Sequence, residues 1–241
     1  MTSMTSTNAT TLTATLEETS STPDRLLGRG TPKTLAILGA TRGVGLSLAE
    51  LALAQGHRVR VLVRDASRLT LRHDRLEVVV GDATSAEDVA RVAMGCDAVC
   101  CAVGAPALSK SKVRSRSAEA LKGGMAAAGV KRLVCLTIFG IGDSEPGLTF
   151  VLRYLIFPLY LRRPAAEHRL QEEILRGSEL DTTFVRPPTL TDGARTGDYR
   201  SDFPATERDI ALKVSRADVA ELMLRSVFDD GSIGQARLVS Y

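Results

Sequence analysis

The glycine-rich turn at residues 39–45 constrains the fold of this chain more than any other feature. An apolar run, Leu35–Leu38, ends at the turn, and leucines at helical spacing follow it over residues 46–53. Strand, phosphate-binding loop and helix in this order form the first unit of a dinucleotide-binding fold. The spacing is Gly-x-x-x-Gly-x-Gly, so the prediction depends on the flanking strand and helix as much as on the glycines.

The turn has features suited to binding a pyrophosphate. Gly39 permits a backbone turn that a Cβ would obstruct, and Gly43 and Gly45 let the chain and the helix start approach the phosphates. The helix start adds unpaired N–H groups and the positive end of the helix dipole. The residues expected to contact the cofactor here are Gly39, Thr41, Arg42, Gly43, Val44 and Gly45.

Strand and helix patterns alternate along the rest of the chain, which is typical of a parallel sheet covered on both faces. Strands are expected over 34–39, 58–63, 76–80, 97–103, 132–137 and 181–186, with an edge strand over 236–240. Helices are expected over 43–55, after Ser85, over 113–129 and 165–176, and after Ser215. We therefore expect one α/β domain, a doubly wound (Rossmann) parallel sheet, over residues 33–241.

The first 32 residues are expected to lie outside this domain. Residues 1–23 are rich in Ser and Thr and contain no Lys or Arg, so a disordered tail is expected. The tail lacks the basic and apolar regions of a secretory signal. Glu17 and Glu18 precede any Arg, unlike in a transit peptide. A cytoplasmic protein is expected, with organelle targeting by the tail left open.

Charge and composition argue against several kinds of partner. A formal charge of +3 is too small to indicate nucleic-acid binding, and the absence of Trp leaves few stacking platforms. The four cysteines lack the spacing of a zinc site, so no metal is expected, and they are typical of reduced core thiols. A redox-active pair at Cys100 and Cys101 is the alternative, although strand alternation directs them to opposite faces.

One apolar stretch, 148–161, does not fit the strand and helix pattern. It is too short to span a bilayer, and it contains Arg153 and Pro158. We expect a buried helix or a lid beside the active site, since short apolar runs are usually core. A dimer face and a contact with a membrane surface are the alternatives, and both monomer and homodimer are left open.

The end of the second predicted strand selects the cofactor. NAD-specific sites have an acidic residue there, which binds the ribose 2′-hydroxyl. This chain has Arg64 there and Arg68 four residues later, and a guanidinium pairs with a phosphate through two hydrogen bonds. The arginines favour NADP(H), and Arg42 could add to the same clamp. The acidic residue Asp65, directly after Arg64, argues against this preference for NADP(H). The alternative interpretation is that the arginines are solvated surface charges.

The carboxyl ends of the other strands complete the predicted crevice. The residues expected there are Asp82, Ala83, Ala102, Val103, Gly104 and Thr137. The Asp82 carboxylate can accept from the adenine amino group, or it can serve a helix entry instead. The Thr137 hydroxyl could polarise a substrate carbonyl, or it could be bonded within the protein.

Residues 33–241 resemble the atypical short-chain dehydrogenase/reductase group, which includes NmrA-like proteins and flavin reductases of the biliverdin reductase B type. The segments that carry the resemblance are Ile37–Thr41, Val61–Leu69, Val79–Asp82, Asp97–Val99, Val185–Pro188 and Val214–Val219. The resemblance implies that Arg64 and Arg68 hold the NADP 2′-phosphate and that Asp82 holds the adenine. The cofactor-binding set implied at the nicotinamide end is Arg186, Pro187 and Pro188.

The sequence departs from this family near the reacting atoms. Arg42 stands where the family loop usually has Gly, and neither tyrosine of 148–161 is followed by Lys in a Tyr-x-x-x-Lys pair. The Ser and His that face the nicotinamide in the flavin reductase are Ile138 and Thr189 here. His168 matches a family histidine and would be a natural proton donor if it titrates near pH 7, with a packing role as the alternative.

These features together predict an NADPH-dependent oxidoreductase that transfers hydride to a small organic acceptor such as a carbonyl, flavin or quinone. The cofactor carries this chemistry, so the missing Tyr-x-x-x-Lys pair does not exclude it. His168, Thr137 or water would supply the proton. The substrate is expected between residues 104–112, 142–161 and 189–207. A non-redox isomerase or cyclase and an NADP-sensing NmrA-like regulator are the alternatives, because fold alone does not decide function.

Overall fold

The computed structural model describes residues 31–106, 109–207 and 209–241, so most of the predicted tail lies outside the described residues. Its main sheet has the strand order β3-β2-β1-β4-β5-β6-β10-β8. The strands are β1 (Thr34–Leu38), β2 (Arg58–Val63), β3 (Leu76–Val80), β4 (Ala98–Cys101), β5 (Arg132–Leu136), β6 (Asp181–Arg186), β8 (Arg200–Ser201) and β10 (Ala236–Ser240). All neighbours pair in parallel except β10 and β8.

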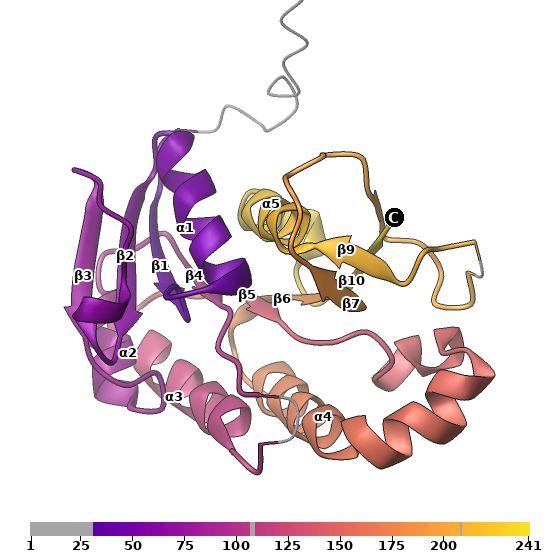
Figure 1. Cartoon of the computed structure of the whole chain (residues 1–241). Helices are drawn as coiled ribbons and strands as arrows, with labels where there is room; N and C mark the ends of the chain where they lie inside the picture. The colour runs from indigo at the N-terminus through magenta and orange to yellow at the C-terminus, as the bar shows by residue number, and fades with distance from the viewer. Residues whose placement is uncertain (1–30, 107–108, 208) are drawn as a thin grey trace, which may run out of the picture.

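Helices cover both faces of this sheet (Figure 1). Helices α1 (Gly43–Ala54) and α5 (Arg216–Val227) pack together on one face. Helices α2 (Ala86–Ala93), α3 (Val113–Ala128) and α4 (Arg162–Arg176) form the layer on the other face. This is the doubly wound Rossmann arrangement, and the predicted fold class is confirmed.

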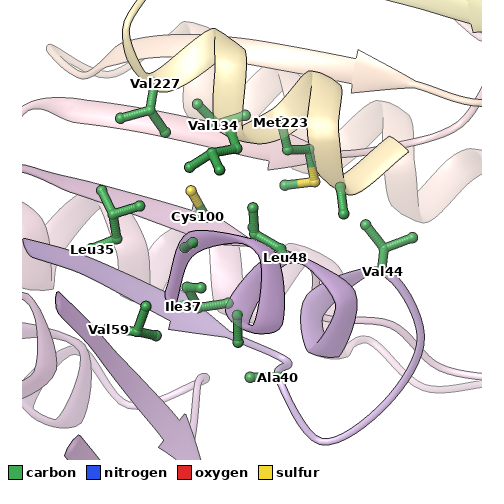
Figure 2. Close-up of a cluster of buried hydrophobic side chains, with 14 of the residues drawn as sticks. Leu35, Ile37, Ala40, Val44, Leu48, Val59, Cys100, Val134, Met223 and Val227 are labelled. Atoms are coloured by element: carbon green, nitrogen blue, oxygen red, sulfur yellow. The ribbon is translucent and has the colours of Figure 1, made fainter. Parts of the chain in front are cut away.

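Strand β1 lies between β2 and β4 inside the sheet and is buried on both faces. Leu35 and Ile37 point into the cluster under α1 and α5, where they meet Leu48 and Met223 (Figure 2). The alternate residues of β1 belong to the opposite cluster, under α2 and α3. Because both faces are covered, the strand is continuously apolar rather than alternating. Each buried Leu or Ile contributes roughly 1.5–3 kcal/mol relative to an exposed one.

The cysteines are all core residues. Cys100 belongs to the cluster under α1 and α5, whereas Cys101 belongs to the cluster on the opposite face and pairs in register with Cys135. Burial raises the pKa of the Cys100 thiol to about 12. All four cysteines are buried and form no disulfide. The prediction of core thiols is confirmed, and the geometry opposes a redox-active pair at Cys100 and Cys101 because their side chains lie on opposite faces of the sheet.

Several elements differ from the sequence prediction. Strand β10 is not an edge strand, because β8 pairs with it antiparallel and occupies the edge. A separate parallel pair, β7 (Thr189–Thr191) and β9 (Lys213–Ser215), was not predicted. Helix α4 begins at Arg162 instead of residue 165. Strands of two or three residues are too short to show a period in the sequence, which explains why they were missed.

The apolar stretch 148–161 is the largest departure. Its last ten residues form a π-helix, η4 (Leu152–Leu161), which continues directly into α4. It follows the short helix η3 (Gly142–Gly147) and lies on the far side of the molecule from β3 (Figure 1). The expectation of a buried helix is wrong, because the segment projects past the sheet. More than half of each of these side chains is exposed: Phe150, Val151, Tyr154, Leu155, Leu159 and Tyr160.

Within the described residues, no helix is long and apolar enough to cross a membrane.

Candidate active site

A cleft of about 1010 Å³ follows the carboxyl ends of the central strands. This volume is at the upper end of the range for small-molecule and cofactor sites. The predicted site residues that line the cleft are Gly39, Thr41, Arg42, Gly43, Val44, Arg64, Arg68, Asp82, Ala83, Ala102, Val103, Gly104, Thr137, His168, Pro187 and Pro188. The structure therefore brings together segments distant in sequence, and of the predicted set it leaves only Gly45 and Arg186 outside the cleft lining.

The glycines of the loop have different roles. A Cβ on Gly39 would lie 2.6 Å from the Ala102 carbonyl oxygen, and one on Gly45 would lie 2.2 Å from the carbonyl oxygen of Gly39. These two glycines therefore allow strand, loop and helix to pack together. Gly43 has a φ of +61°, and a Cβ there would first meet the Arg216 side chain at 3.6 Å. Gly43 is the glycine that faces the space a pyrophosphate would need.

The start of α1 has the features of an anion site. No side chain caps it, and its first turn contains no acidic residue. The N–H groups of this turn and the helix dipole are thus available to a phosphate in the cleft.

Three exposed arginines lie in the loops after β1 and β2. Arg42, Arg64 and Arg68 are exposed and line the cleft. Within the described residues, none of their guanidinium groups forms an ion pair or hydrogen bond. Asp65 forms no ion pair with them within the described residues, and its Oδ1 accepts from the Ser67 amide at 2.9 Å and from the Ser67 hydroxyl at 2.7 Å. These bonds hold the pKa of Asp65 below its ordinary value.

Asp82 shapes the turn after β3 and also lines the cleft. Its Oδ1 accepts hydrogen bonds from the amide and the hydroxyl of Thr84, at 2.8 and 2.9 Å. The helix that follows is capped by Ser85, whose Oγ accepts from the Asp88 amide at 3.2 Å. Asp82 is therefore not the helix cap. In the described part of the chain, its Oδ2 has no hydrogen-bond partner and remains available as an acceptor.

The opposite end of the cleft rests on a buried charge network. Thr137 Oγ1 donates to Glu172 Oε1 at 2.8 Å. Arg186 holds the same carboxylate through Nε at 2.9 Å and Nη2 at 2.6 Å, and its Nη1 contacts Asp143. The Thr137, Glu172 and Arg186 side chains are buried. The hydroxyl proton of Thr137 is thus directed at Glu172, which leaves it unsuited to polarise a substrate carbonyl.

Arg186 lies away from the cleft. Its side chain lines a second cavity of about 320 Å³, together with Asp143, Asp202 and Arg237. Its two bonds to Glu172 explain this orientation, since a buried guanidinium needs a paired carboxylate. The geometry therefore gives Arg186 a supporting role beneath Thr137 rather than a contact with cofactor.

His168 lines the cleft in a buried, neutral form. Its Nδ1 lies 3.1 Å from Gln171 Oε1, and the Gln171 amide nitrogen donates to Cys135 Sγ at 3.3 Å. This network assigns the imidazole proton to Nδ1 and leaves Nε2 as an acceptor. Burial, and next the positive charge of Arg114, lower the pKa of His168 to about 3. A proton donor was expected to titrate near pH 7. His168 does not, because its charged form is poorly solvated in this buried position.

Sequence reasoning missed a set of charged residues in the cleft. These are Lys112, Arg114 and Arg116 around the start of α3, together with Asp192 and Arg216. Arg216 pairs with Asp192 close to the phosphate loop. The sequence did contain a signal for Lys112, Arg114 and Arg116. They are three basic residues at alternate positions after the predicted strand 97–103. The described residues of 142–161 do not line the cleft, so the structure does not bring the predicted lid segment to it.

Within the described residues, no group of His, Cys, Asp and Glu side chains could hold a metal ion.

Comparison with known proteins identifies the family of this chain. The model of a family described as NAD(P)H-binding matches residues 39–230. A reductase from Streptomyces griseus subsp. griseus, named (4-alkanoyl-5-oxo-2,5-dihydrofuran-3-yl)methyl phosphate reductase, is 30% identical over 156 residues. That match covers 65% of this chain and 48% of the relative, so the chain spans about half the length of that protein.

Solved structures share the fold over most of the chain. The oxidoreductase ylbE from Lactococcus lactis matches with a TM-score of 0.72 and 23% identity, over 86% of this chain and 90% of that one. ChuY, an anaerobilin reductase from Escherichia coli O157:H7, matches with a TM-score of 0.68 and 26% identity, over 86% and 96%. The family model, which matches most of the chain, establishes that the chain belongs to the NAD(P)H-binding family, and the glycine loop, the doubly wound sheet and the cleft agree with it.

Proposed function

We propose that this protein is an NADPH-dependent oxidoreductase that transfers a hydride to a small organic acceptor. The observation that carries the choice of NADPH is the set of exposed arginines that line the cleft, Arg42 before α1 and Arg64 and Arg68 after β2, which form no ion pair within the described residues. An NAD-specific site would place a carboxylate there to bind a hydroxyl, whereas guanidinium groups suit a phosphate. The family membership and the similarity to named reductases support a redox role.

Different residues of the cleft bind different parts of the cofactor. The start of α1 and Gly43 bind the pyrophosphate, and Arg64 and Arg68 clamp the 2′-phosphate. Asp82 Oδ2 accepts from the adenine. The small residues Ala102, Val103 and Gly104 let the cofactor lie close to the end of β4, and Pro187 and Pro188 line the nicotinamide end. When bound there, NADPH supplies the hydride.

We propose that water supplies the proton. The two side chains expected as donors are both engaged, since Thr137 donates to Glu172 and His168 Nδ1–H points at Gln171. His168 Nε2 instead accepts a hydrogen bond from the substrate and so orients it. Protonation from solvent suits an acceptor such as a flavin or quinone, which can take its proton after hydride transfer.

Consumption of NADPH tests the proposal directly. The protein is assayed with NADPH and NADH against flavins, quinones and carbonyl compounds, with Gly43→Val as the matched control. That variant puts a branched Cβ at a positive φ in the phosphate loop, so it should lose NADPH binding while it keeps the fold. Tight NADPH binding with no turnover on any acceptor would contradict the redox proposal.

The missing Tyr-x-x-x-Lys pair favours a second candidate, a non-redox isomerase or cyclase that retains the cofactor site. It predicts tight NADP binding and no net oxidation of NADPH. An NADP-sensing regulator predicts the same lack of turnover, and a pull-down that depends on NADP would distinguish it from the isomerase.

We also propose that the protein works in the cytoplasm on a small-molecule substrate, as a monomer or homodimer. The buried, unpaired cysteines support a reducing compartment. Sedimentation analysis of the purified chain checks the oligomeric state, and microscopy of a tagged chain checks the compartment.

A further inference from the structure

Arg114, the second residue of α3, is a buried cation in the cleft. Only 8% of the residue is exposed, and it lines the cleft beside Gly104 and His168. Its Nη2 donates to the carbonyl oxygen of Ala105 at 3.1 Å. Within the described part of the chain, its Nε is buried and has no hydrogen-bond partner.

The charge of Arg114 is incompletely compensated by the protein. No carboxylate among the described residues forms an ion pair with it. Glu167 acts on it only at longer range, since Glu167 Oε2 accepts a hydrogen bond from Ser115 Oγ at 3.0 Å. Burial of a guanidinium is unfavourable unless an anion pairs with it. The arrangement therefore leaves a preformed cation that a bound anion would complete.

Neighbouring groups add to the positive character of this region. Lys112 and Arg116, two residues before and after Arg114 in the chain, also line the cleft, and the first turn of α3 contains no acidic residue. His168 Nε2, in the neutral tautomer, is an acceptor beside them and can bind a protonated oxygen of a ligand. An anion and a hydroxyl on one small molecule would thus both find partners here.

This cationic region lies apart from the expected phosphate sites of the cofactor. The phosphate loop opens α1, which packs with α5 on one face of the sheet. Arg114 comes from α3, which lies in the layer on the opposite face (Figure 1). It contacts the loop after β4 and lines the cleft beside His168 of α4. The 2′-phosphate cluster lies at the end of β2, two strands away from β4 in the sheet order. Arg114 is therefore free to serve the substrate.

We propose that Arg114 anchors an anionic group, a carboxylate or a phosphate monoester, on the organic acceptor. The inference rests on the proposed function, because it places the acceptor beside the nicotinamide end of the cleft. The planar guanidinium presents two N–H groups to such an anion, and low exposure strengthens the interaction. Acceptors with an anionic group should then be preferred over neutral ones of the same shape.

The test uses the full chain saturated with NADP and three probes of similar shape, benzoate, phenyl phosphate and neutral benzyl alcohol. Calorimetry should show that one or both anions bind at least about tenfold more tightly than benzyl alcohol. The tighter anion identifies carboxylate or phosphate as the favoured group. Arg114→Gln and Arg114→Met should remove this preference. Lys122→Gln, an exposed charge change on the same helix and outside the cleft, should retain it.

Separate measurements distinguish failure of this inference from failure of the proposed function. NADPH affinity is measured first, without probes, and should change less than about twofold in either Arg114 variant. A parallel loss of NADPH affinity would assign Arg114 to the cofactor and overturn the inference, as would equal binding of anionic and neutral probes. If the intact protein binds no NADPH, the proposed function fails, and the same titrations on the free protein still decide the anion preference.

Folding of the variants is checked by circular dichroism. If neither loss variant folds, Arg114→Lys, which keeps the charge and loses the two-pronged geometry, is titrated instead. A preference reduced in that variant supports the inference, and an unchanged preference contradicts it.

Discussion

The two ends of the cleft are built in different ways. At the end proposed for the adenosine, Arg64 and Arg68 are exposed, and within the described residues their side chains form no ion pair or hydrogen bond. At the end proposed for the reaction, Thr137, Glu172 and Arg186 are buried, and both Thr137 and Arg186 donate to the Glu172 carboxylate. The first end offers free groups to a ligand, whereas the second has already used its polar groups to hold the fold. Substitutions should therefore alter binding at the first end and stability at the second.

The largest expected effect is loss of stability on replacement of Glu172 by Ala. The change leaves the Arg186 guanidinium buried with only the exposed Asp143 as a partner. Breaking a buried pair in this way lowers the free energy of unfolding by about 3–5 kcal/mol. Urea denaturation measures it, with Glu173→Ala, an exposed neighbour on the same helix, as control. A loss below about 1 kcal/mol, typical of a surface pair, would remove the contrast between the two ends.

The second prediction separates two glycines of the phosphate loop. Gly45→Ala should lower the free energy of unfolding by about 1–3 kcal/mol, because its Cβ would overlap the Gly39 carbonyl. Gly43→Ala has space for its Cβ and should cost about 1 kcal/mol, from the positive φ alone. NADPH affinity should instead be the property that Gly43→Ala impairs. Thermal unfolding and NADPH titration of both variants check this, and identical unfolding curves would show that the glycines are equivalent.

A third prediction concerns the adenosine end. Arg64→Ala should weaken NADPH binding by at least about tenfold, because it removes a charge-assisted contact to the 2′-phosphate. NADH affinity should not change, and the free energy of unfolding should stay within about 0.5 kcal/mol. The control is Arg58→Ala, an exposed arginine at the other end of β2. Equal affinity of the intact protein for NADPH and NADH would contradict the proposed preference for NADPH.

The effect that is smallest at neutral pH is the acid sensitivity contributed by His168. In the unfolded chain its imidazole binds a proton near pH 6.5, but burial keeps the pKa in the folded protein at about 3. Stability is therefore full above pH 6.5 and falls as the pH drops toward 3, by at most about 1.4 kcal/mol per pH unit. His168→Gln should flatten this dependence between pH 6.5 and 5. A wild-type stability curve that matches the variant over that range would contradict the buried neutral imidazole.

The fold was predictable because its signals are local. Strands β1, β4 and β5 are mostly apolar runs, β2 alternates Arg and Val before it ends in Leu62 and Val63, and β6 stops at Pro187 and Pro188. Parallel strands also require helices between them. The same reasoning gave a wrong prediction, a buried helix, for the segment 148–161. An apolar run indicates burial only on average, and here the π-helix projects past the sheet.

Sequence reasoning placed residues in the cleft most readily where they directly follow a strand. Gly43, Arg64 and Asp82 line the cleft as predicted, because their position after a strand can be read from the sequence, and their contacts with a cofactor stay predictions. Thr137 and Arg186 are defined by Glu172, which is 35 residues from the first and 14 from the second. A partner so distant in the chain is fixed by tertiary packing and leaves no local pattern, so the engagement of both side chains could not be read from the sequence.

The contact between Gly45 and the carbonyl of Gly39 has a consequence for recognising loops of this kind. Position 42 carries Arg where the resembling family usually carries Gly, and its φ of −167° is extended backbone that any residue adopts. Only positions 39 and 45 are restricted by backbone atoms in their way. A sequence motif that requires glycine at position 42 therefore rejects chains in which the backbone allows any residue there. A motif that requires glycine only where a Cβ would overlap backbone atoms would retain chains such as this one and would reject accidental glycine clusters.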